Sequence, residues 1–153
     1  MKKNAGFTLY ELIITMAVIS ILSAIAAPYF TRLSAGFKLN SATREMQADL
    51  QAARLFAINK NSYAVINFYK DSYKVFIDNG KNSGDWNQDA DEKTVINRPL
   101  PAGIYLSSNC LNNRLRFTPT GTVASRSVFL TNKNDKNKTI SMSRTGRINV
   151  KWE

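Results

Sequence analysis

Carboxylate and amide side chains gather in one short segment, and their oxygens are the groups in this sequence best suited to holding a metal ion. Residues 78–92, DNGKNSGDWNQDADE, contain five acidic residues and three asparagines. Alternating oxygen side chains are what a hard cation such as calcium requires. The EF-hand spacing fails, because the third position from Asp78 is Gly80 and the sixth from Asp85 is Ala90. We therefore predict a solvated, turn-rich loop between strands here, and no metal site.

The residue types on which most catalytic sites depend are absent or isolated. The chain has no histidine, the commonest general base and the commonest metal ligand. Cys110 is the single cysteine, so the chain can form no intrachain disulfide, and we expect its side chain to be buried rather than nucleophilic. The sequence contains no glycine-rich phosphate loop and no nucleophile elbow. The composition predicts a protein that is not an enzyme and has no cofactor.

The basic residues are concentrated in the second half of the chain. Lysine and arginine total 21 against 11 acidic residues, which gives a formal net charge of +10 at pH 7. Residues 38–93 carry eight residues of each sign, whereas residues 94–153 carry ten basic and two acidic residues. Such a charge favours an anionic partner, and contacts to a nucleic acid backbone need little more than positive charge and a few aromatic side chains. Double-stranded DNA, bound without sequence specificity, is therefore one candidate partner.

One further carboxylate, Glu11, stands at the start of an apolar segment. Residues 12–31 contain no charged residue, and twenty residues at about 1.5 Å of helical rise each cover the roughly 30 Å core of a bilayer. Lys2 and Lys3 precede the segment and favour a cytoplasmic N-terminus. The sequence thus predicts one membrane-spanning helix. A charge at the centre of such a helix costs roughly 2.5–3.5 kcal/mol, and less near its ends, so Glu11 is expected to have a partner.

An ordinary secretory signal is the alternative interpretation of the same segment. Ala24, Ile25 and Ala26 imitate a small-x-small cleavage site, and cleavage there would release a soluble secreted protein. Glu11 argues against it, because an apolar signal segment gains nothing from a carboxylate. We therefore favour a retained membrane helix.

Beyond the apolar segment the pattern indicates that the helix continues. Pro28 lacks an amide proton and is expected to kink the helix rather than to end it. From residue 32 to residue 59, apolar side chains recur at steps of three and four, with charged residues on other faces, which is typical of an amphipathic helix packed on a core. The residues of the predicted apolar face are Leu39, Ala42, Met46, Leu50, Ala53 and Ala57.

After residue 59 the pattern changes to short runs of aromatic and β-branched residues. Residues 62–69 and 72–78 are separated by Lys70 and Asp71 and predict a β-hairpin. A long helix followed only by strands predicts an α+β fold, in which the helix packs on an antiparallel sheet formed by residues 60–153. The further predicted strands lie within residues 103–108, 115–123, 127–132, 139–143 and 146–152.

The N-terminal stretch AGFTLYELIITMAVISILSAIAAPYF, residues 5–30, resembles the class III leader and first helix of type IV pilins and of the related type II secretion pseudopilins. The resemblance implies that residues 1–6 are a leader, that a prepilin peptidase cuts between Gly6 and Phe7, and that the new amino group of Phe7 is methylated. Residues 7–31 would then be the transmembrane and assembly part of the helix. Glu11 would pair with the N-terminal amine of a neighbouring subunit, and such a pair in a low dielectric fixes the register between helices.

The C-terminal stretches RLRFTPTGTV, residues 114–123, and ISMSRTGRINV, residues 140–150, resemble the GspH/FimT subgroup of minor pilins. In FimT-like members a terminal Gly-Arg-x-Arg motif is associated with DNA binding. Gly146 and Arg147 match its first two positions, but Asn149 replaces the second arginine, which removes a bidentate phosphate donor. The residues that remain candidates for DNA contact are Lys133, Lys136, Lys138, Arg144, Arg147 and Lys151.

The resemblance covers nearly the whole chain and implies a structural role. We expect a minor type IV pilin that takes part in pilus assembly and priming, with a further role in DNA uptake; the alternative is a minor pseudopilin of a type II secretion system. The expected partners are other pilins, through the N-terminal helix, the prepilin peptidase and the inner membrane. The C-terminal domain would be periplasmic until the processed subunit enters a pilus or pseudopilus.

Overall fold

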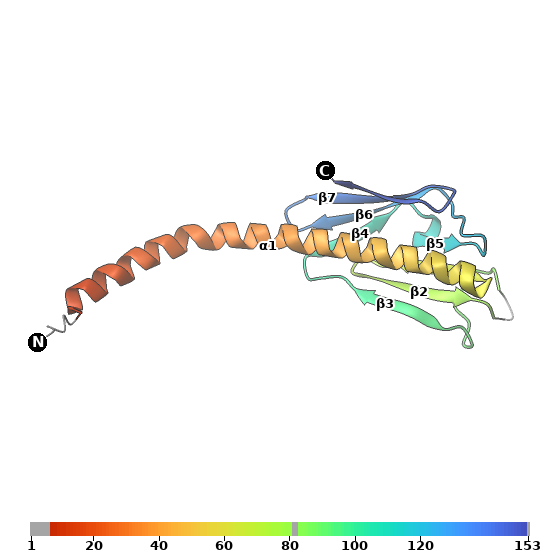
Figure 1. Ribbon diagram of the computed structural model, residues 1–153, viewed down its shortest axis with the longest axis horizontal. Coiled ribbons are helices and arrows are strands. Elements are labelled where there is room, and N and C mark those ends of the chain that lie inside the picture. The colour runs from red at the N-terminus through yellow and green to blue at the C-terminus, as the bar shows by residue number, and fades with distance from the viewer. Residues whose placement is uncertain (1–6, 81–82, 153) are drawn as a thin grey trace, which may run out of the picture. The chain divides into compact units, whose positions relative to one another are not determined.

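A computed structural model describes residues 7–80 and 83–152 of the chain (Figure 1). They form two compact units, one ending at Ser34 and the other beginning at Ala35. Helix α1 (Leu9–Lys60) belongs to both units, and all the strands belong to the second. The observed α+β organisation, a long N-terminal helix followed by antiparallel strands, confirms the predicted fold class.

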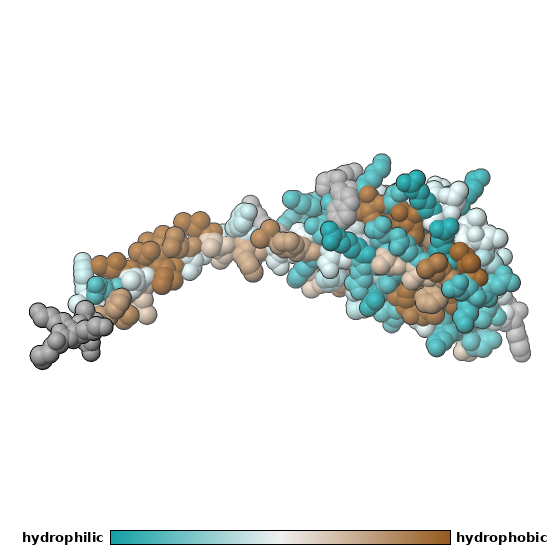
Figure 2. Space-filling view, viewed as in Figure 1, coloured by the Kyte–Doolittle hydropathy of each residue, from teal (hydrophilic) through white to brown (hydrophobic). Residues whose placement is uncertain are grey.

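The part of α1 in the first unit has the length and composition of a membrane-spanning helix. Its apolar side chains are exposed, and Figure 2 shows them as a predominantly hydrophobic surface. The hydroxyl groups of Thr15 and Ser20 donate to the carbonyls of Leu12 and Met16, at 2.8 Å each, so these polar groups are satisfied within the helix, as an apolar environment requires. The helix continues through Pro28, as expected.

The part of α1 in the second unit contributes one face to a hydrophobic core. All six residues of the predicted apolar face are buried. Their spacing of three or four residues places them on one side of the helix, towards the sheets. Three further residues on this side are buried as well: Ala35, Thr43 and Asp49. The amphipathic pattern therefore predicted the packed face correctly, except for its polar members.

The strands form two four-stranded antiparallel sheets. The first contains β1 (Tyr63–Phe68), β2 (Ser72–Asp78), β3 (Thr94–Pro99) and β5 (Arg114–Phe117), in the order β3-β2-β1-β5. The second contains β4 (Ile104–Ser108), β6 (Arg126–Asn132), β7 (Asn137–Met142) and β8 (Ile148–Trp152), in the order β4-β6-β7-β8. Side chains from both sheets and from α1 share one core, with Leu50, Ile66 and Leu130 among its buried members.

The sequence did not predict strand β3, and it suggested one sheet where the structure has two. β3 lies at an edge of its sheet and pairs only with β2. Its last three residues, from Asn97 to Pro99, are exposed, so the strand lacks the apolar alternation that marks a half-buried strand. The run 115–123 is also strand only as far as Phe117, because a turn closed by Thr118 and Thr122 follows.

The loop between β2 and β3 is less solvated than predicted. Asp78 and Glu92 are buried, and their carboxylates accept backbone hydrogen bonds from Gly84 and Gly80 at 2.8 and 3.0 Å. The Arg116 guanidinium donates to the Gly84 carbonyl and lies 4.3 Å from the ring centroids of both Tyr63 and Trp86. In the described part of the chain no cluster of three or more acidic, histidine or cysteine side chains could hold a metal ion. The backbone hydrogen bonds that these two carboxylates accept shape the loop.

A hydrogen-bond network links α1 to the edge of the first sheet. The Tyr73 hydroxyl donates to Asp49 Oδ2 at 2.8 Å, and Arg98 Nε donates to the same oxygen at 3.1 Å. Burial, together with the hydrogen bond to Asp49, raises the pKa of the Tyr73 hydroxyl. A buried phenol next to a carboxylate thus remains protonated at a pH where an exposed one ionises.

We expect this network to make stability fall at alkaline pH. An unfolded tyrosine ionises near pH 10, so the contribution of Tyr73 is complete below about pH 10 and is lost as the pH rises towards its higher folded-state pKa. Replacing Tyr73 by Phe should cost roughly 1.5–3 kcal/mol at neutral pH, the usual value of a hydrogen bond to a charged group. Denaturant unfolding of both proteins between pH 7 and 11 checks this, since the difference between them should shrink above pH 10. A constant difference would contradict it.

Candidate assembly and binding surfaces

The residues at the start of α1 form a reciprocal cap. Thr8 donates to Glu11 Oε2 through its backbone nitrogen at 2.9 Å and through its hydroxyl group at 3.0 Å. The backbone nitrogen of Glu11 in turn donates to the Thr8 hydroxyl oxygen at 3.3 Å. This is a capping box, which satisfies backbone donors that a helix start leaves without partners. The helix therefore begins with Glu11 held close to the end of the chain that processing would create.

The position of Glu11 fits the predicted ion pair. Phe7 is 81% exposed and lies immediately before the capping residue Thr8. Both hydrogen bonds from Thr8 use Oε2, so Oε1 is not engaged by the cap. Gly6, on the other side of the predicted cut, lies outside the described residues. A carboxylate at an exposed helix start, followed by an uncharged helical segment, can bind an amine of a second chain.

The structure adds Thr8, which we did not predict from the sequence, to this candidate site. The sequence does contain the pattern of a capping box, which is a Thr followed three positions later by a Glu, before an apolar run. Glu11 also caps the helix, so its replacement by alanine affects both helix initiation and charge.

The structure separates the six predicted DNA-contacting residues into two groups. Four lysines gather where β6 ends and β7 begins, because Lys133 and Lys136 lie in the connecting turn and Lys138 and Lys151 lie on strands that pair beside it. Arg144 and Arg147 lie in the turn from β7 to β8, at the other end of the same strands. No single surface on this sheet therefore presents all six residues together.

Arg54 of α1 fixes the turn that carries Arg147. Its Nε donates to the Gly121 carbonyl at 3.0 Å and its Nη2 to the Thr145 carbonyl at 3.3 Å, so it joins the turns that follow β5 and β7. Gly146 has φ +78° and fits closely, because a Cβ there would lie 2.6 Å from Arg54 Nε and still nearer the Gly121 carbonyl oxygen. The sequence motif had marked Gly146 and Arg147, but nothing in it pointed to Arg54.

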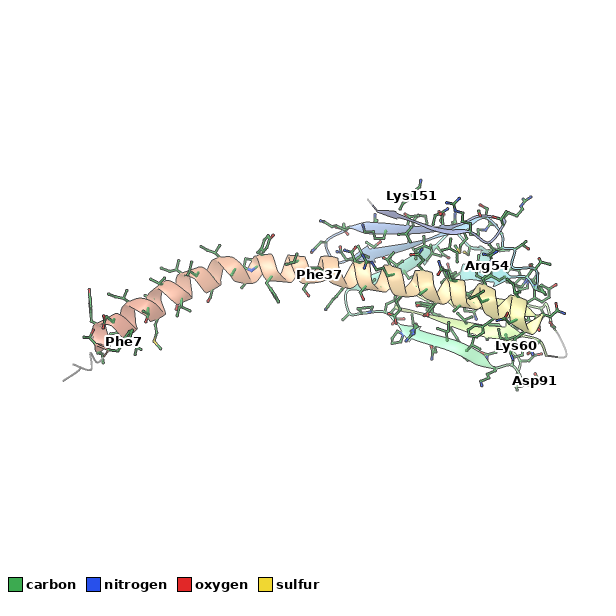
Figure 3. The ribbon with its side chains drawn as sticks, in the orientation of Figure 1. Phe7, Phe37, Arg54, Lys60, Asp91 and Lys151 are labelled. Carbon is green, nitrogen blue, oxygen red and sulfur yellow. The ribbon has the colours of Figure 1, made fainter. Side chains whose placement is uncertain are left out.

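A groove of about 510 Å³ runs between α1 and this turn. Two guanidinium groups, those of Arg54 and Arg147, line it, and Figure 3 shows Arg54 on α1 beside the strands. Arg147 is exposed and Arg54 is partly exposed. The fold therefore brings a second arginine to the turn at which the linear motif has Asn149. The other residues that line the groove are Gln51, Leu55, Thr145, Gly146 and Ile148.

Two protein families match the chain. Residues 42–146 match the family described as type II transport protein GspH, and residues 1–27 match the prokaryotic N-terminal methylation motif. A shorter similarity, 40% identity over 62 residues, relates the chain to the type IV major pilin protein PilA of Myxococcus xanthus strain DK1622. This similarity covers 40% of the chain and 28% of PilA, so the chain spans less than a third of that relative.

Solved structures with this fold come from both kinds of fibre. The type IV minor pilin FimU of Pseudomonas aeruginosa strain PAO1 aligns with a TM-score of 0.59 at 21% identity, over 74% of this chain and 93% of FimU. The minor pseudopilin EpsH of the type 2 secretion system of Vibrio cholerae aligns with a TM-score of 0.59 at 12% identity, over 74% of this chain and 95% of EpsH. At these identities the alignments establish the fold alone. They show that the chain has the fold of FimU and EpsH. The family match over residues 42–146 shows that the chain belongs to the GspH family, a family of type IV pilin-like structural components and not of enzymes.

Proposed function

We propose that the protein is a minor type IV pilin that takes part in the assembly and priming of a pilus. The observation that carries this proposal is the capped Glu11, four residues after Phe7 and at the start of an uncharged helical segment. The chain would be held in the inner membrane by residues 7–31, with its strands in the periplasm. After cleavage, the new amine of one subunit would bind Glu11 of its neighbour, and the pair would set the axial register of the two helices.

A minor pseudopilin of a type II secretion system is the alternative within the same family. It would use the same N-terminal arrangement, so the chemistry of the N-terminus cannot distinguish the two functions. The phenotype of a gene deletion can. Deletion of the gene should abolish surface pili and leave secretion of folded proteins intact. The opposite result, with normal pili and lost secretion, would favour the alternative.

Processing at the N-terminus gives the most direct test of the proposal. We expect mass spectrometry of the mature protein to find Phe7 as the first residue, carrying one methyl group on its amine. Substitution Gly6→Val is the control, because it should leave the leader attached. A mature chain that begins at Ala27 would instead identify the segment as an ordinary secretory signal and would exclude assembly through Glu11.

Non-specific binding of double-stranded DNA is a second candidate function, supported by the groove that Arg54 and Arg147 share. Two guanidinium groups at one groove supply bidentate phosphate donors, and Arg54 would stand in for the arginine that the motif lacks at Asn149. The hydrogen bonds of Arg54 to two carbonyls leave its positive charge in place. Such binding would be sequence-indifferent and sensitive to salt.

The separation of the basic residues gives this function a matched test. We expect Arg147→Ala to weaken duplex binding and to reduce the slope of log affinity against log salt by about 0.9, the loss expected for one phosphate contact. Lys133→Ala removes the same charge at the other end of the strands and should change both values less. Fluorescence anisotropy with the full chain in detergent measures the affinity and its dependence on salt. Equal effects, or no binding at low salt, would contradict a role for the arginine groove.

A further inference from the structure

Several segments meet at the end of the second unit where α1 enters it. Asn132 Nδ2 donates to the Ala35 carbonyl at 3.4 Å, and Asn132 also pairs with Ile104 at the start of β4. Farther along β4, the Leu106 backbone nitrogen donates to the Lys70 carbonyl in the turn between β1 and β2. We call this surface the Ala35 end; it comprises residues 35–38, 69–71, 103–105 and 132–138, together with Lys151, whose pairing partner Thr139 adjoins the last segment.

The Ala35 end is strongly basic. Its segments carry six lysines and two aspartates, Asp71 and Asp135, which gives a net charge of +4. Residues 78–92, at the other end of the first sheet, carry five acidic residues and one lysine. Figure 3 shows Phe37 and Asp91 at opposite ends of this unit. The Ala35 end is therefore a basic surface, and its lysines are Lys38, Lys70, Lys133, Lys136, Lys138 and Lys151.

Exposed aromatic side chains lie among these lysines. Phe37 is 62% exposed, Tyr69 51% and Tyr105 48%. The Lys70 ammonium lies 5.4 Å from the centroid of the Tyr105 ring, which places a cation and an aromatic ring on the same patch. Aromatic rings and lysines together are typical of protein surfaces at the level of lipid headgroups, where the rings enter the interface and the ammonium groups reach phosphate.

Chain length holds this patch near the membrane. Phe37 follows Thr31, the last residue of the uncharged run, by six residues. Six residues span at most about 22 Å even when fully extended, so Phe37 cannot move farther than this from the end of the spanning segment. Anionic headgroups attract basic residues within roughly a Debye length of the surface, about 8–10 Å. A second copy of the chain would present the same positive charge, and like charges oppose such a contact.

We propose that the Ala35 end docks on anionic phospholipid headgroups of the leaflet from which α1 emerges, before the subunit enters a fibre. This inference rests on the proposed anchoring of residues 7–31 in the membrane. The lysines bind lipid phosphate, and Phe37, Tyr69 and Tyr105 enter the interface beside them. Docking holds the strands against the bilayer, and assembly has to break this contact when it lifts the subunit out.

Headgroup proximity can be measured on the full chain in nanodiscs. A fluorophore is attached to Asn134→Cys in the β6–β7 turn, or to Ser125→Cys before β6, in a Cys110→Ala background, and lipids with nitroxide headgroups act as quenchers. We expect strong quenching at position 134 and weak quenching at position 125 in discs of three parts phosphatidylcholine to one part phosphatidylglycerol. Quenching at position 134 should decrease in pure phosphatidylcholine and at high salt.

Charge reversal tests whether the Ala35 end is the surface that docks on the headgroups. Lys70→Glu, Lys133→Glu and Lys136→Glu together should lower the ratio of docked to undocked chains by at least roughly a hundredfold, because the loss of three lysines alone gives about this factor and the anionic surface also repels the new glutamates. The matched control reverses Lys60, Lys93 and Arg126, which are exposed residues outside the Ala35 end, and should preserve quenching.

The outcomes separate docking from anchoring. Chains that do not cofloat with the discs would overturn the anchoring and the docking with it. Chains that cofloat but show equal quenching in neutral and anionic discs, or are equally affected by both triple variants, would overturn the docking alone. Quenching that depends on two chains per disc would also overturn it, and would assign the patch to a neighbouring subunit.

Discussion

Replacement of Glu11 by alanine is expected to leave the chain in the membrane but to lower its incorporation into fibres by at least tenfold. Removing one partner of a desolvated, hydrogen-bonded charge pair costs roughly 2–5 kcal/mol, and about 1.4 kcal/mol corresponds to a factor of ten. The amine of the neighbouring subunit would be left without its carboxylate in a low dielectric. The ratio of this subunit to the major pilin in purified fibres, compared with its amount in the membrane, measures the effect.

Because Glu11 also belongs to the capping box, the Glu11→Ala experiment needs two control variants. Glu11→Gln keeps a group that can complete the cap, since glutamine serves at this position as glutamate does, but it removes the charge. Thr8→Val removes the hydroxyl that joins the cap and keeps the carboxylate. If the ion pair sets the register, the Glu11→Gln subunit should enter fibres as poorly as the Glu11→Ala subunit. The Thr8→Val subunit should enter them much better. Normal incorporation of Glu11→Gln would show instead that the carboxylate acts only as a helix cap.

Replacement of Gly146 by alanine is expected to destabilise the second unit by about 2–5 kcal/mol. A left-handed backbone conformation costs an alanine roughly 1–2 kcal/mol, and an added methyl group in a close-packed site costs a further 1–3 kcal/mol. Both costs apply here, because Gly146 has φ +78° and its missing Cβ position is occupied by Arg54 and the Gly121 carbonyl. Thermal unfolding of the full chain in detergent should show a midpoint lower by roughly 10 °C or more.

Gly36→Ala supplies the same chemical change without either cost. Gly36 lies within α1, and a Cβ there would have no neighbour within 4 Å. Alanine in a helix interior is favoured over glycine by roughly 0.5–1 kcal/mol, so this variant should be slightly more stable than the natural protein. Similar unfolding midpoints for the two variants would contradict the packing that we describe between Arg54 and the turn at Gly146.

Local patterns predicted the parts of this protein that depend on neighbours along the chain. The uncharged run after Glu11 determined a helix long enough to span a membrane, because helical rise and bilayer thickness are fixed quantities. The steps of three and four residues from Leu39 to Ala57 determined the buried face of α1, because the periodicity of a helix decides which side chains share a side. The sequence did not predict the edge strand β3, because the exposed end of this strand has no alternation of apolar and polar residues.

What the sequence by itself determined is therefore the leader-like N-terminus, the helix, most strands and the total charge. Only the tertiary structure decided which charges act together. It separated Arg144 and Arg147 from the four lysines, because antiparallel pairing places the two turns of β7 at opposite ends of the strand. It also brought Arg54 to Gly146 across 92 positions of sequence, since a helix and a sheet packed on one core meet wherever their surfaces fit. Contacts of this kind depend on distance in space, and no spacing along the chain encodes them.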